Sequence, residues 1–505
     1  MRKQSTAFDI TLPPKRQNVA SYQWLYESLR DQILEGHLRP GSRLPATRDM
    51  ARQYSFARGT VVNAFERLQS EGYVEGTVGS GTYVSRVLPD DLLRVQVSAE
   101  RLGATPKRAK KRAISDYGKR VLLFGGYERG PVRAFRANLP ALNLFPVKTW
   151  TQLTTRCLKK MSVRNLMDCD AMGEEGLRHA VSDYLVASRG VKCEADQVAI
   201  VSGVQEAIDI AARLFLDPGD EVGMERPGYP GAALAFAAVG AKIRAIGLDQ
   251  DGIRLNELPQ KGMRLLYVTP GHQFPLGTTM SLARRLELLQ WAGTSGAMIL
   301  EDDYDGEYRY SGKPIPALQG LDPRGCVLYA GSFSKVMFPA LRLGYLVVTD
   351  DLVDRVRAIK SLTTRHAPVL EQLVLREFIE EGHFGRHLRR MRQIYAERLA
   401  ILVEEARARL AGVMKISEVE AGLQTVGWLK QGTAAEAVAR AALERGVEVT
   451  PLSRYAGEVP SRHPVSRRYV SEGLQLGFAA LDGAEIRRGM HELAIVLERL
   501  MRSER

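Results

Sequence analysis

The sequence of 505 residues is too long for one ordinary hydrophobic core, so we expect a small domain joined to a larger one. Hydrophobic residues make up 45% and charged residues 26% of the chain, which is typical of a soluble globular protein. No apolar run approaches the ~18 residues that a membrane span needs, and no apolar segment follows the basic N-terminus, so the sequence argues against a membrane protein and favours the cytoplasm.

The positive charge is concentrated near the N-terminus. Residues 1–133 contain 23 Lys plus Arg and 13 Asp plus Glu, an excess of ten positive charges, whereas the rest of the chain holds only three of the net +13. Such a segment attracts a polyanion and releases its counterions. On charge alone, a solubilising surface is the better explanation, so a DNA-binding function has to be argued from the motifs.

The cysteines give no sign of a metal site. None lies in a C-x-x-C spacing, and no histidine is placed to complete a zinc site. We therefore expect no structural metal and four reduced thiols, at Cys157, Cys169, Cys193 and Cys326.

The first elements in the chain predict a helix-turn-helix with a wing. Residues 22–35 carry apolar side chains on one helical face, and glycine and proline end that helix. A second short helix is expected in LPATRDMARQY and a third in ARGTVVNAFERLQSEG, whose N-terminal end can enter a DNA groove. The segment YVEGTVGSGTYVS then predicts a β-hairpin.

Four motifs in this region, GHLRPG, LPATR, RGTV and GSGTYV, resemble the GntR-type winged helix in order and spacing. The resemblance implies a DNA-binding domain over residues 16–86, with Arg48, Arg58, Thr60 and Gly79 in contact with operator DNA. The alternative is that the arginines are ordinary surface residues and the glycine only shapes a turn. Four ordered motifs in a basic unit make that alternative the weaker one.

Residues 87–133 are expected to be a basic linker. Apolar periodicity fades there, and five of the six residues 107–112 are Lys or Arg. The linker either adds contacts to DNA phosphates or is a solvated tether, and both interpretations fit the sequence equally well.

The remainder of the chain, residues 134–505, predicts an α/β domain with a largely parallel sheet. Helical patterns alternate with β-rich runs such as QVAIVSG, EVGMERP, RLLYVTP, AMILEDD and CVLYAGSFS. Because ligands in such sheets bind beyond the carboxyl ends of the strands, the residues that follow these runs are the candidates for a site.

Those residues form a chemically unusual set. VSGVQ opens a helix and suits a phosphate, Asp302 and Asp303 end another strand, and Lys335 precedes Arg342 by seven positions. An isolated lysine near an acid is best explained as a salt bridge. Pyridoxal 5′-phosphate (PLP) explains the whole set, because it needs an amine, an acid for its ring nitrogen, an aromatic face and phosphate donors. A neighbouring cation or a desolvated pocket would lower the lysine pKa.

The large domain resembles the fold-type-I aminotransferases, and among them the MocR-type regulators that join this fold to a GntR-type winged helix. The resemblance runs from about Asn138 to near the C-terminus. Its marks are LFP, SGVQEAIDIAARLFLDPGD, ERPGYPGA, VTPGHQFPLGTTM, EDDYDGEYRY, SFSK and HLRRMRQIY. The implied fold class is α/β, with an N-terminal winged helix-turn-helix and a large PLP-dependent aminotransferase-like domain.

The resemblance also implies roles for single residues. Lys335 would carry the cofactor as a Schiff base, and Asp302 would pair with the ring nitrogen. Tyr304 would hydrogen-bond the phenolic oxygen, and Tyr229 would stack on the ring. The phosphate would be held by Gly203, Val204, Gln205, Ser332, Ser334 and Arg342.

The sequence departs from aminotransferases at the substrate side. Phe274 stands where they usually have an asparagine, and Gln475 stands where they have the arginine that grips the substrate carboxylate. Gly231 offers no second cation, and His272 is either functional or an ordinary loop residue. An ordinary sheet role for Gln475 also stays open. Four arginines in the loop SRYAGEVPSRHPVSRR are candidates to replace the missing charge: Arg454, Arg462, Arg467 and Arg468.

These observations favour a homodimeric transcription regulator that binds operator DNA and senses an amine, an amino acid or a vitamin B6 vitamer. The competing hypothesis is an active aminotransferase with an accessory DNA-binding domain, which Gln475 disfavours; we expect at most partial transamination. A nucleoid-associated binder is disfavoured by the intact cofactor set.

Overall fold

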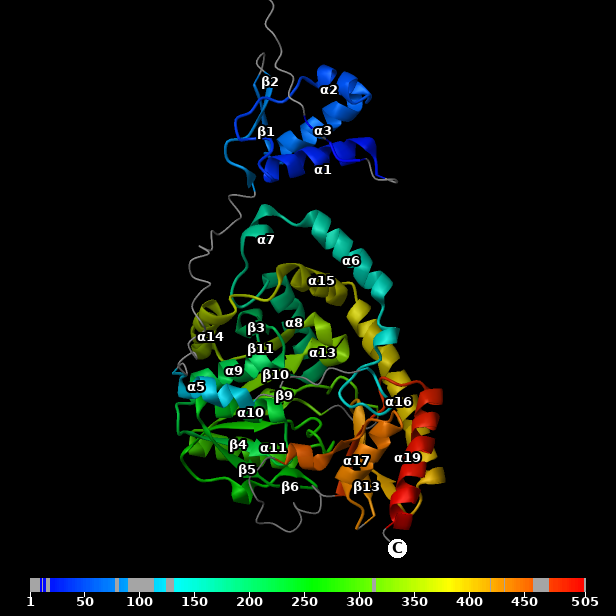
Figure 1. The fold of residues 1–505 in the computed structure, drawn as a ribbon. Helices are drawn as coiled ribbons and strands as arrows, with labels where there is room; N and C mark the ends of the chain where they lie inside the picture. Colours follow the sequence, from blue (N-terminus) through cyan, green and yellow to red (C-terminus); the bar gives the residue numbers. More distant parts are fainter. Residues whose placement is uncertain are drawn as a thin grey trace, which may run out of the picture. The chain divides into compact units, whose positions relative to one another are not determined.

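The computed structural model describes residues 10, 12–14, 19–77, 81–89, 113–123, 131–310, 315–417, 419–430, 432–456 and 472–503. They belong to two compact units, residues 1–112 and 113–505 (Figure 1). Several predicted features lie outside the described residues, namely Gly79, the basic run 107–112, Arg462, Arg467 and Arg468.

The N-terminal unit is a three-helix winged fold, as the sequence predicts. Its elements are α1 (Ser21–Leu34), α2 (Thr47–Gln53), α3 (Arg58–Ser70), β1 (Val74–Thr77) and β2 (Gly81–Val84). Leu25 and Leu29 of α1 meet Val61 and Leu68 of α3 in one core, because their helical spacing places them on facing sides. The two strands are antiparallel, with Val74 opposite Val84.

The large unit is built on a seven-stranded sheet in the order β3-β11-β10-β9-β8-β4-β5. The strands are β3 (Val198–Val201), β4 (Glu221–Glu225), β5 (Lys242–Ile246), β8 (Met263–Val268), β9 (Met298–Asp303), β10 (Val327–Ser332) and β11 (Gly344–Val347). Only β11 is antiparallel to its neighbours, so the predicted largely parallel sheet is confirmed.

The two faces of this sheet pack against different groups of helices (Figure 1). Along β3, Val198 and Ile200 point into one core, while Ala199 and Val201 point into the other, which is the two-residue period of a strand. One core includes α8 (Glu175–Arg189) and α15 (Val369–Glu380), and the other includes α9 (Val204–Phe215), α10 (Pro230–Val239) and α14 (Asp350–Thr363). Burial on both faces explains why the strands read as continuous apolar runs.

A second sheet, antiparallel, forms the C-terminal part of the same unit. Its order is β12-β13-β15-β14, from β12 (Met414–Ile416), β13 (Gln424–Leu429), β14 (Thr450–Pro451) and β15 (Gly473–Gly477). The helices beside it are α16 (His383–Arg409), α17 (Ala435–Glu444) and α19 (Gly483–Ser503), coloured yellow to red in Figure 1.

The other described α-helices and strands of the large unit are α5 (Asp116–Arg120), α6 (Val147–Lys160), α7 (Val163–Met167), β6 (Leu248–Asp249), β7 (Gly252–Ile253), α11 (Leu282–Ser295), α12 (Leu318–Leu321) and α13 (Phe333–Val336). None of the helices in the described ranges combines the length and the apolar character needed to cross a membrane.

Candidate cofactor site

The predicted site residues gather where the strands of the large sheet end. Strands β9 and β10 are parallel, and their register places Asp302 beside Ala330 and Asp303 beside Gly331. The chain leaving β10 turns at once into the single helical turn α13, which carries Lys335. The acid and the lysine therefore come to the same edge of the sheet, as expected for a doubly covered parallel sheet.

Lys335 is held in a desolvated position. Its Nζ donates a hydrogen bond to the backbone oxygen of Asn138 at 2.8 Å. Burial lowers the pKa of Lys335 to about 8, although Asp305 and Asp302 act in the opposite direction. The sequence suggested either a neighbouring cation or desolvation as the cause of a lowered lysine pKa, and desolvation is the one that lowers the pKa of Lys335. A lysine with this pKa has an appreciable neutral fraction near pH 7–8, which is what a nucleophilic amine requires.

Asp302 presents one unsatisfied oxygen. Its side chain is 3% exposed, and Oδ2 accepts a hydrogen bond from the Tyr267 hydroxyl at 2.6 Å. Oδ1 is buried without a partner among the residues that the structure describes. Burial raises the pKa of Asp302 to about 7; Asp303 adds to this, whereas Tyr267 and Lys335 oppose it. A buried acceptor of this kind is costly unless a donor meets it, and a protonated ring nitrogen would be such a donor.

The second acid of the pair, Asp303, has a different partner. The Arg189 Nε lies 2.8 Å from Asp303 Oδ2, and the Tyr329 hydroxyl donates to the same oxygen at 2.6 Å. Arg189 lies on α8, far from Asp303 in sequence, so the sequence patterns did not identify it. Asp303 is therefore ion-paired with Arg189, whereas Asp302 keeps one carboxylate oxygen free.

The residues predicted to hold the phosphate lie at the start of α9. Gly203 adopts a φ of 100°, a conformation that favours glycine, and the helix begins at the next residue. A Cβ on Gly203 would lie 3.4 Å from the nearest guanidinium nitrogen of Arg342, so this exposed arginine lies over the helix start. Gly344, opposite Ser332 in the β10–β11 pair, also approaches Gly203. The N-terminal amides of a helix and an arginine are what a phosphate requires.

Two further polar atoms at this place lack partners. Ser334 Oγ and Gln205 Oε1 are buried, and neither has a hydrogen-bond partner within the described part of the chain. Ser332 instead caps α13, because its hydroxyl accepts a hydrogen bond from the Ser334 amide at 3.1 Å. Ser334 can donate directly to a phosphate, whereas Ser332 shapes the turn and retains its own hydroxyl hydrogen. Val204 contributes only its backbone, as the first residue of α9.

Four aromatic side chains of the large unit, including the predicted site residues Tyr229 and Tyr304, pack against one another. Tyr229 caps α10, and its ring centre lies 5.7 Å from that of Phe274, which lies 5.9 Å from that of Tyr304. Phe274 also meets Tyr455 at 5.1 Å, and all three contacts are edge-to-face. Phe274 thus replaces a polar amide by an apolar bridge between the rings.

His272 and Asp305 extend the site behind Tyr304. The Tyr304 hydroxyl lies 3.0 Å from His272 Nδ1, which lies 3.0 Å from Asp305 Oδ1. Burial raises the pKa of Tyr304 well above its usual range, and Asp305 adds to this, so the phenol remains protonated and can donate. These hydrogen bonds place His272 beside a predicted site residue, and both interpretations of His272 stay open. The sequence patterns did not identify Asp305 as a site residue, although it lies in the motif EDDYDGEYRY.

Gln475 lies fully buried in β15. Its Oε1 accepts a hydrogen bond from the Tyr455 hydroxyl at 2.7 Å, and its Nε2 is buried with no partner in the described ranges. The neighbouring Arg454 belongs to the same short turn as Tyr455, residues Leu452–Tyr455. The amide side chain is therefore tied to the aromatic cluster through Tyr455.

The predicted DNA contacts that the structure describes lie at helix starts. Arg58 is the first residue of α3 and Arg48 the second residue of α2, and both side chains are exposed. Thr60 is the third residue of α3 and is partly exposed. No acidic residue occupies the first turn of α3, which leaves its positive end open to a phosphate.

Two family models match the chain. Residues 21–84 match "Bacterial regulatory proteins, gntR family", and residues 137–490 match "Aminotransferase class I and II". Together they cover the two units described above.

Individual proteins match over nearly the whole length. The "Probable rhizopine catabolism regulatory protein MocR" of Rhizobium meliloti is 39% identical over 94% of this chain and 93% of its own. An uncharacterized HTH-type transcriptional regulator, YhdI of Bacillus subtilis, is 31% identical over 95% of this chain and 96% of its own. Among solved structures, kynurenine aminotransferase from Pyrococcus horikoshii, in complex with PMP, matches with a TM-score of 0.66 and 26% identity, covering 80% of this chain and 98% of its own.

Proposed function

Because this chain belongs to the MocR-type regulators, which join a gntR-family winged helix to an aminotransferase class I and II domain, we propose that its large domain is a receptor for a small amine-bearing effector. The protein is a PLP-dependent, DNA-binding transcription regulator. The proposal concerns what the PLP-binding domain does: it senses an amine, an amino acid or a B6 vitamer, and it does not turn over substrate at an appreciable rate.

The observation that carries this proposal is Gln475. In aminotransferases that resemble this domain, an arginine at this place grips the substrate carboxylate; here the side chain is neutral, buried and hydrogen-bonded to Tyr455. A neutral amide cannot form the bidentate ion pair that holds an α-carboxylate in a reactive orientation. The groups expected to hold the cofactor are nevertheless present. A site that keeps its cofactor set but lacks the substrate cation is suited to recognition rather than turnover.

Each proposed binding residue has a distinct task. When bound, PLP supplies an electrophilic carbon that amines attack and a ring that withdraws electrons. Lys335 would provide the amine that holds the cofactor covalently, and Asp302 would accept a hydrogen bond at its free Oδ1. Tyr304 would donate from a phenol that burial keeps protonated, and Tyr229 would stack on the ring. The phosphate is assigned to the start of α9, Ser332, Ser334 and Arg342.

The N-terminal unit is assigned to operator recognition. We place the DNA-binding domain at residues 16–86, the linker at 87–133 and the effector domain at 134–505. Arg48, Arg58 and Thr60 supply the contacts to DNA from exposed helix starts, and Gly79 is assigned with them by motif. A homodimer would present two winged helices to two half-sites, and an effector that binds one dimer arrangement better than another would change operator affinity.

The first test is the visible absorbance of the purified protein beside Lys335→Ala, before and after adding candidate amines. The wild type should be yellow and the variant colourless, and one amine should shift the wild-type spectrum. Lys192→Ala, which removes an exposed lysine, is the matched control and should stay yellow.

Two outcomes would contradict the proposal. A coloured Lys335→Ala variant would mean that another lysine holds the cofactor. Rapid conversion of an amino acid when a keto acid is supplied as acceptor would favour the alternative, an active aminotransferase with an accessory DNA-binding domain.

A further inference from the structure

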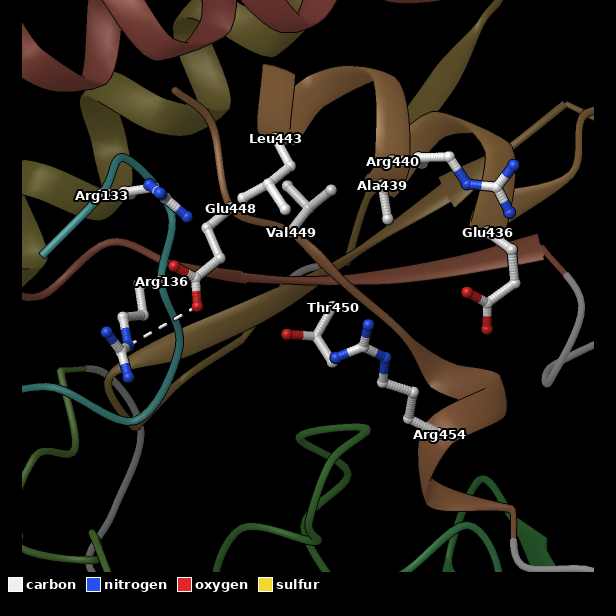
Figure 2. Close-up of a pocket in the computed structure, with 10 residues that line it drawn as sticks. All are labelled: Arg133, Arg136, Glu436, Ala439, Arg440, Leu443, Glu448, Val449, Thr450 and Arg454. Atoms are coloured by element: carbon white, nitrogen blue, oxygen red, sulfur yellow. Dashed lines mark ion pairs between the residues drawn. The ribbon is translucent and has the colours of Figure 1, made fainter. Parts of the chain in front are cut away.

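A cavity of about 350 Å³ lies beside the C-terminal sheet, and it is rich in arginine. Figure 2 shows arginines reaching it from three segments: the chain entering the large unit, the helix α17 and the turn after β14. The charged residues that line it are Arg133, Arg136, Arg440, Arg454, Glu436 and Glu448. Small and apolar side chains, including Ala439 and Val449, form the rest of the wall.

The charges in this cavity are unbalanced. Four arginines and two glutamates line the cavity, a formal excess of two positive charges. Both carboxylates already have partners, because Glu448 Oε1 lies 3.5 Å from Arg136 Nε and Glu436 accepts a hydrogen bond from Ser453. The side chains of Arg133 and Arg440 form no ion pair within the described part of the chain. Like charges gathered in a concave surface repel one another and raise the local affinity for anions.

The cavity adjoins the place where the substrate cation is missing. Thr450, which lines the cavity, lies directly opposite Gln475 in the β14–β15 pair. Opposite residues of an antiparallel pair project to the same face of the sheet. Arg454 immediately precedes Tyr455, whose hydroxyl binds Gln475 and whose ring meets Phe274. The arginine that aminotransferases have at position 475 is therefore absent from β15, but arginines line a cavity that includes the neighbouring strand β14 and the turn after it.

We propose that this cavity binds a small organic anion with two negative charges, either a dicarboxylate or a phosphate monoester. Two negative charges match the excess in the cavity, and the planar guanidinium fork suits carboxylate and phosphate oxygens alike. The identification of this anion as part of an effector rests on the proposed sensing function, whereas the binding itself does not.

The test is isothermal titration calorimetry on the full-length protein saturated with PLP, so that the cofactor's own phosphate site is filled. The probes are glutarate and glycerol 3-phosphate, with 1,5-pentanediol and glycerol as neutral controls. The double variant Arg133→Gln/Arg440→Gln removes the two arginines that form no ion pair, and Arg407→Gln removes an exposed arginine of α16 that does not line the cavity.

We expect at least one dianion to bind the wild type and Arg407→Gln equally, and the double variant to bind it at least about tenfold more weakly, since each charged hydrogen bond contributes that much or more. The neutral probes should not bind, and salt should weaken binding of the dianion. Binding of glutarate alone identifies a dicarboxylate site, and binding of glycerol 3-phosphate alone a phosphate monoester site.

Absence of binding by both dianions, or unchanged affinity in the double variant, would overturn the inference. These outcomes are distinct from failure of the proposed function. A protein that ignores both dianions but still changes colour with an amine keeps its sensing role and loses only the anion site. A protein that binds the dianion but changes colour with none of the amines keeps the anion site and loses the sensing role.

Discussion

At the scale of single residues, burial moves the pKa values of both the acid and the lysine of the cofactor site. Asp302 has a buried oxygen without a hydrogen-bond partner in the described part of the chain, and its pKa is raised to about 7. Lys335 has its pKa lowered to about 8. Both shifts mean that the cofactor-free protein disfavours the charged forms that the bound cofactor would stabilise, a pattern typical of binding sites.

Asp302→Asn should change how the stability of the cofactor-free protein depends on pH. The pKa of Asp302 is raised from 3.8 to about 7, so the folded state binds more protons than the unfolded state between these values. The stabilisation from the neutral carboxyl is complete below pH 4 and is lost as the pH rises toward 7. The variant lacks this loss, so relative to wild type it should gain stability between pH 5 and pH 8, by about 3 kcal/mol.

Urea unfolding at the two pH values measures this gain. Asp183→Asn, at an exposed position of α8, is the matched control and should show no such gain. A difference between wild type and Asp302→Asn that does not change with pH would mean that Asp302 is already ionised at pH 5.

At the scale of elements, the proposed binding of DNA and of the cofactor depends on the groups exposed at the N-terminal ends of two helices, α3 and α9. We propose that the first amides of α3 and α9 bind an anion, which would be a DNA phosphate at α3 and the cofactor phosphate at α9. In α3 the buried stripe of Val61, Phe65 and Leu68 fixes the helix to its unit and leaves Arg58 exposed at the first turn. In α9 the N-cap residue is Gly203, whose positive φ and missing side chain leave the first amides of the helix accessible.

Arg58→Ala should weaken specific operator binding by about 1–3 kcal/mol if the side chain reads a base, because a bidentate contact to a base contributes that amount. A fluorescence anisotropy titration with operator and scrambled duplexes at one salt concentration measures it. Gln69→Ala, near the other end of α3, should bind like wild type. An equal loss on both duplexes would assign Arg58 to phosphate contact instead.

At the scale of the whole molecule, we propose that the small unit recognises DNA and the large unit recognises a small molecule. Fold-type-I proteins build their site at a dimer interface, and a winged helix on each subunit matches an operator with two half-sites. Sedimentation equilibrium of the full-length protein at micromolar concentration should therefore give twice the mass of one chain. Footprinting should protect two half-sites separated by whole helical turns. A monomer that still binds PLP and its operator would exclude this arrangement.

The sequence by itself determined the order of elements, the winged helix, the parallel sheet and the candidate residues of the cofactor site. These features are local: helical spacing, buried strands and short motifs such as SFSK specify them within a few turns of chain.

Only the tertiary structure decided which side chains meet across large separations in sequence. Arg189 rather than Lys335 pairs with Asp303, Tyr267 holds Asp302, and His272 joins Tyr304 to Asp305. The arginine cavity likewise combines three segments that no local pattern relates. Such contacts depend on the packing of whole elements, because sheet order and helix docking, and not spacing along the chain, determine which polar groups share a desolvated space.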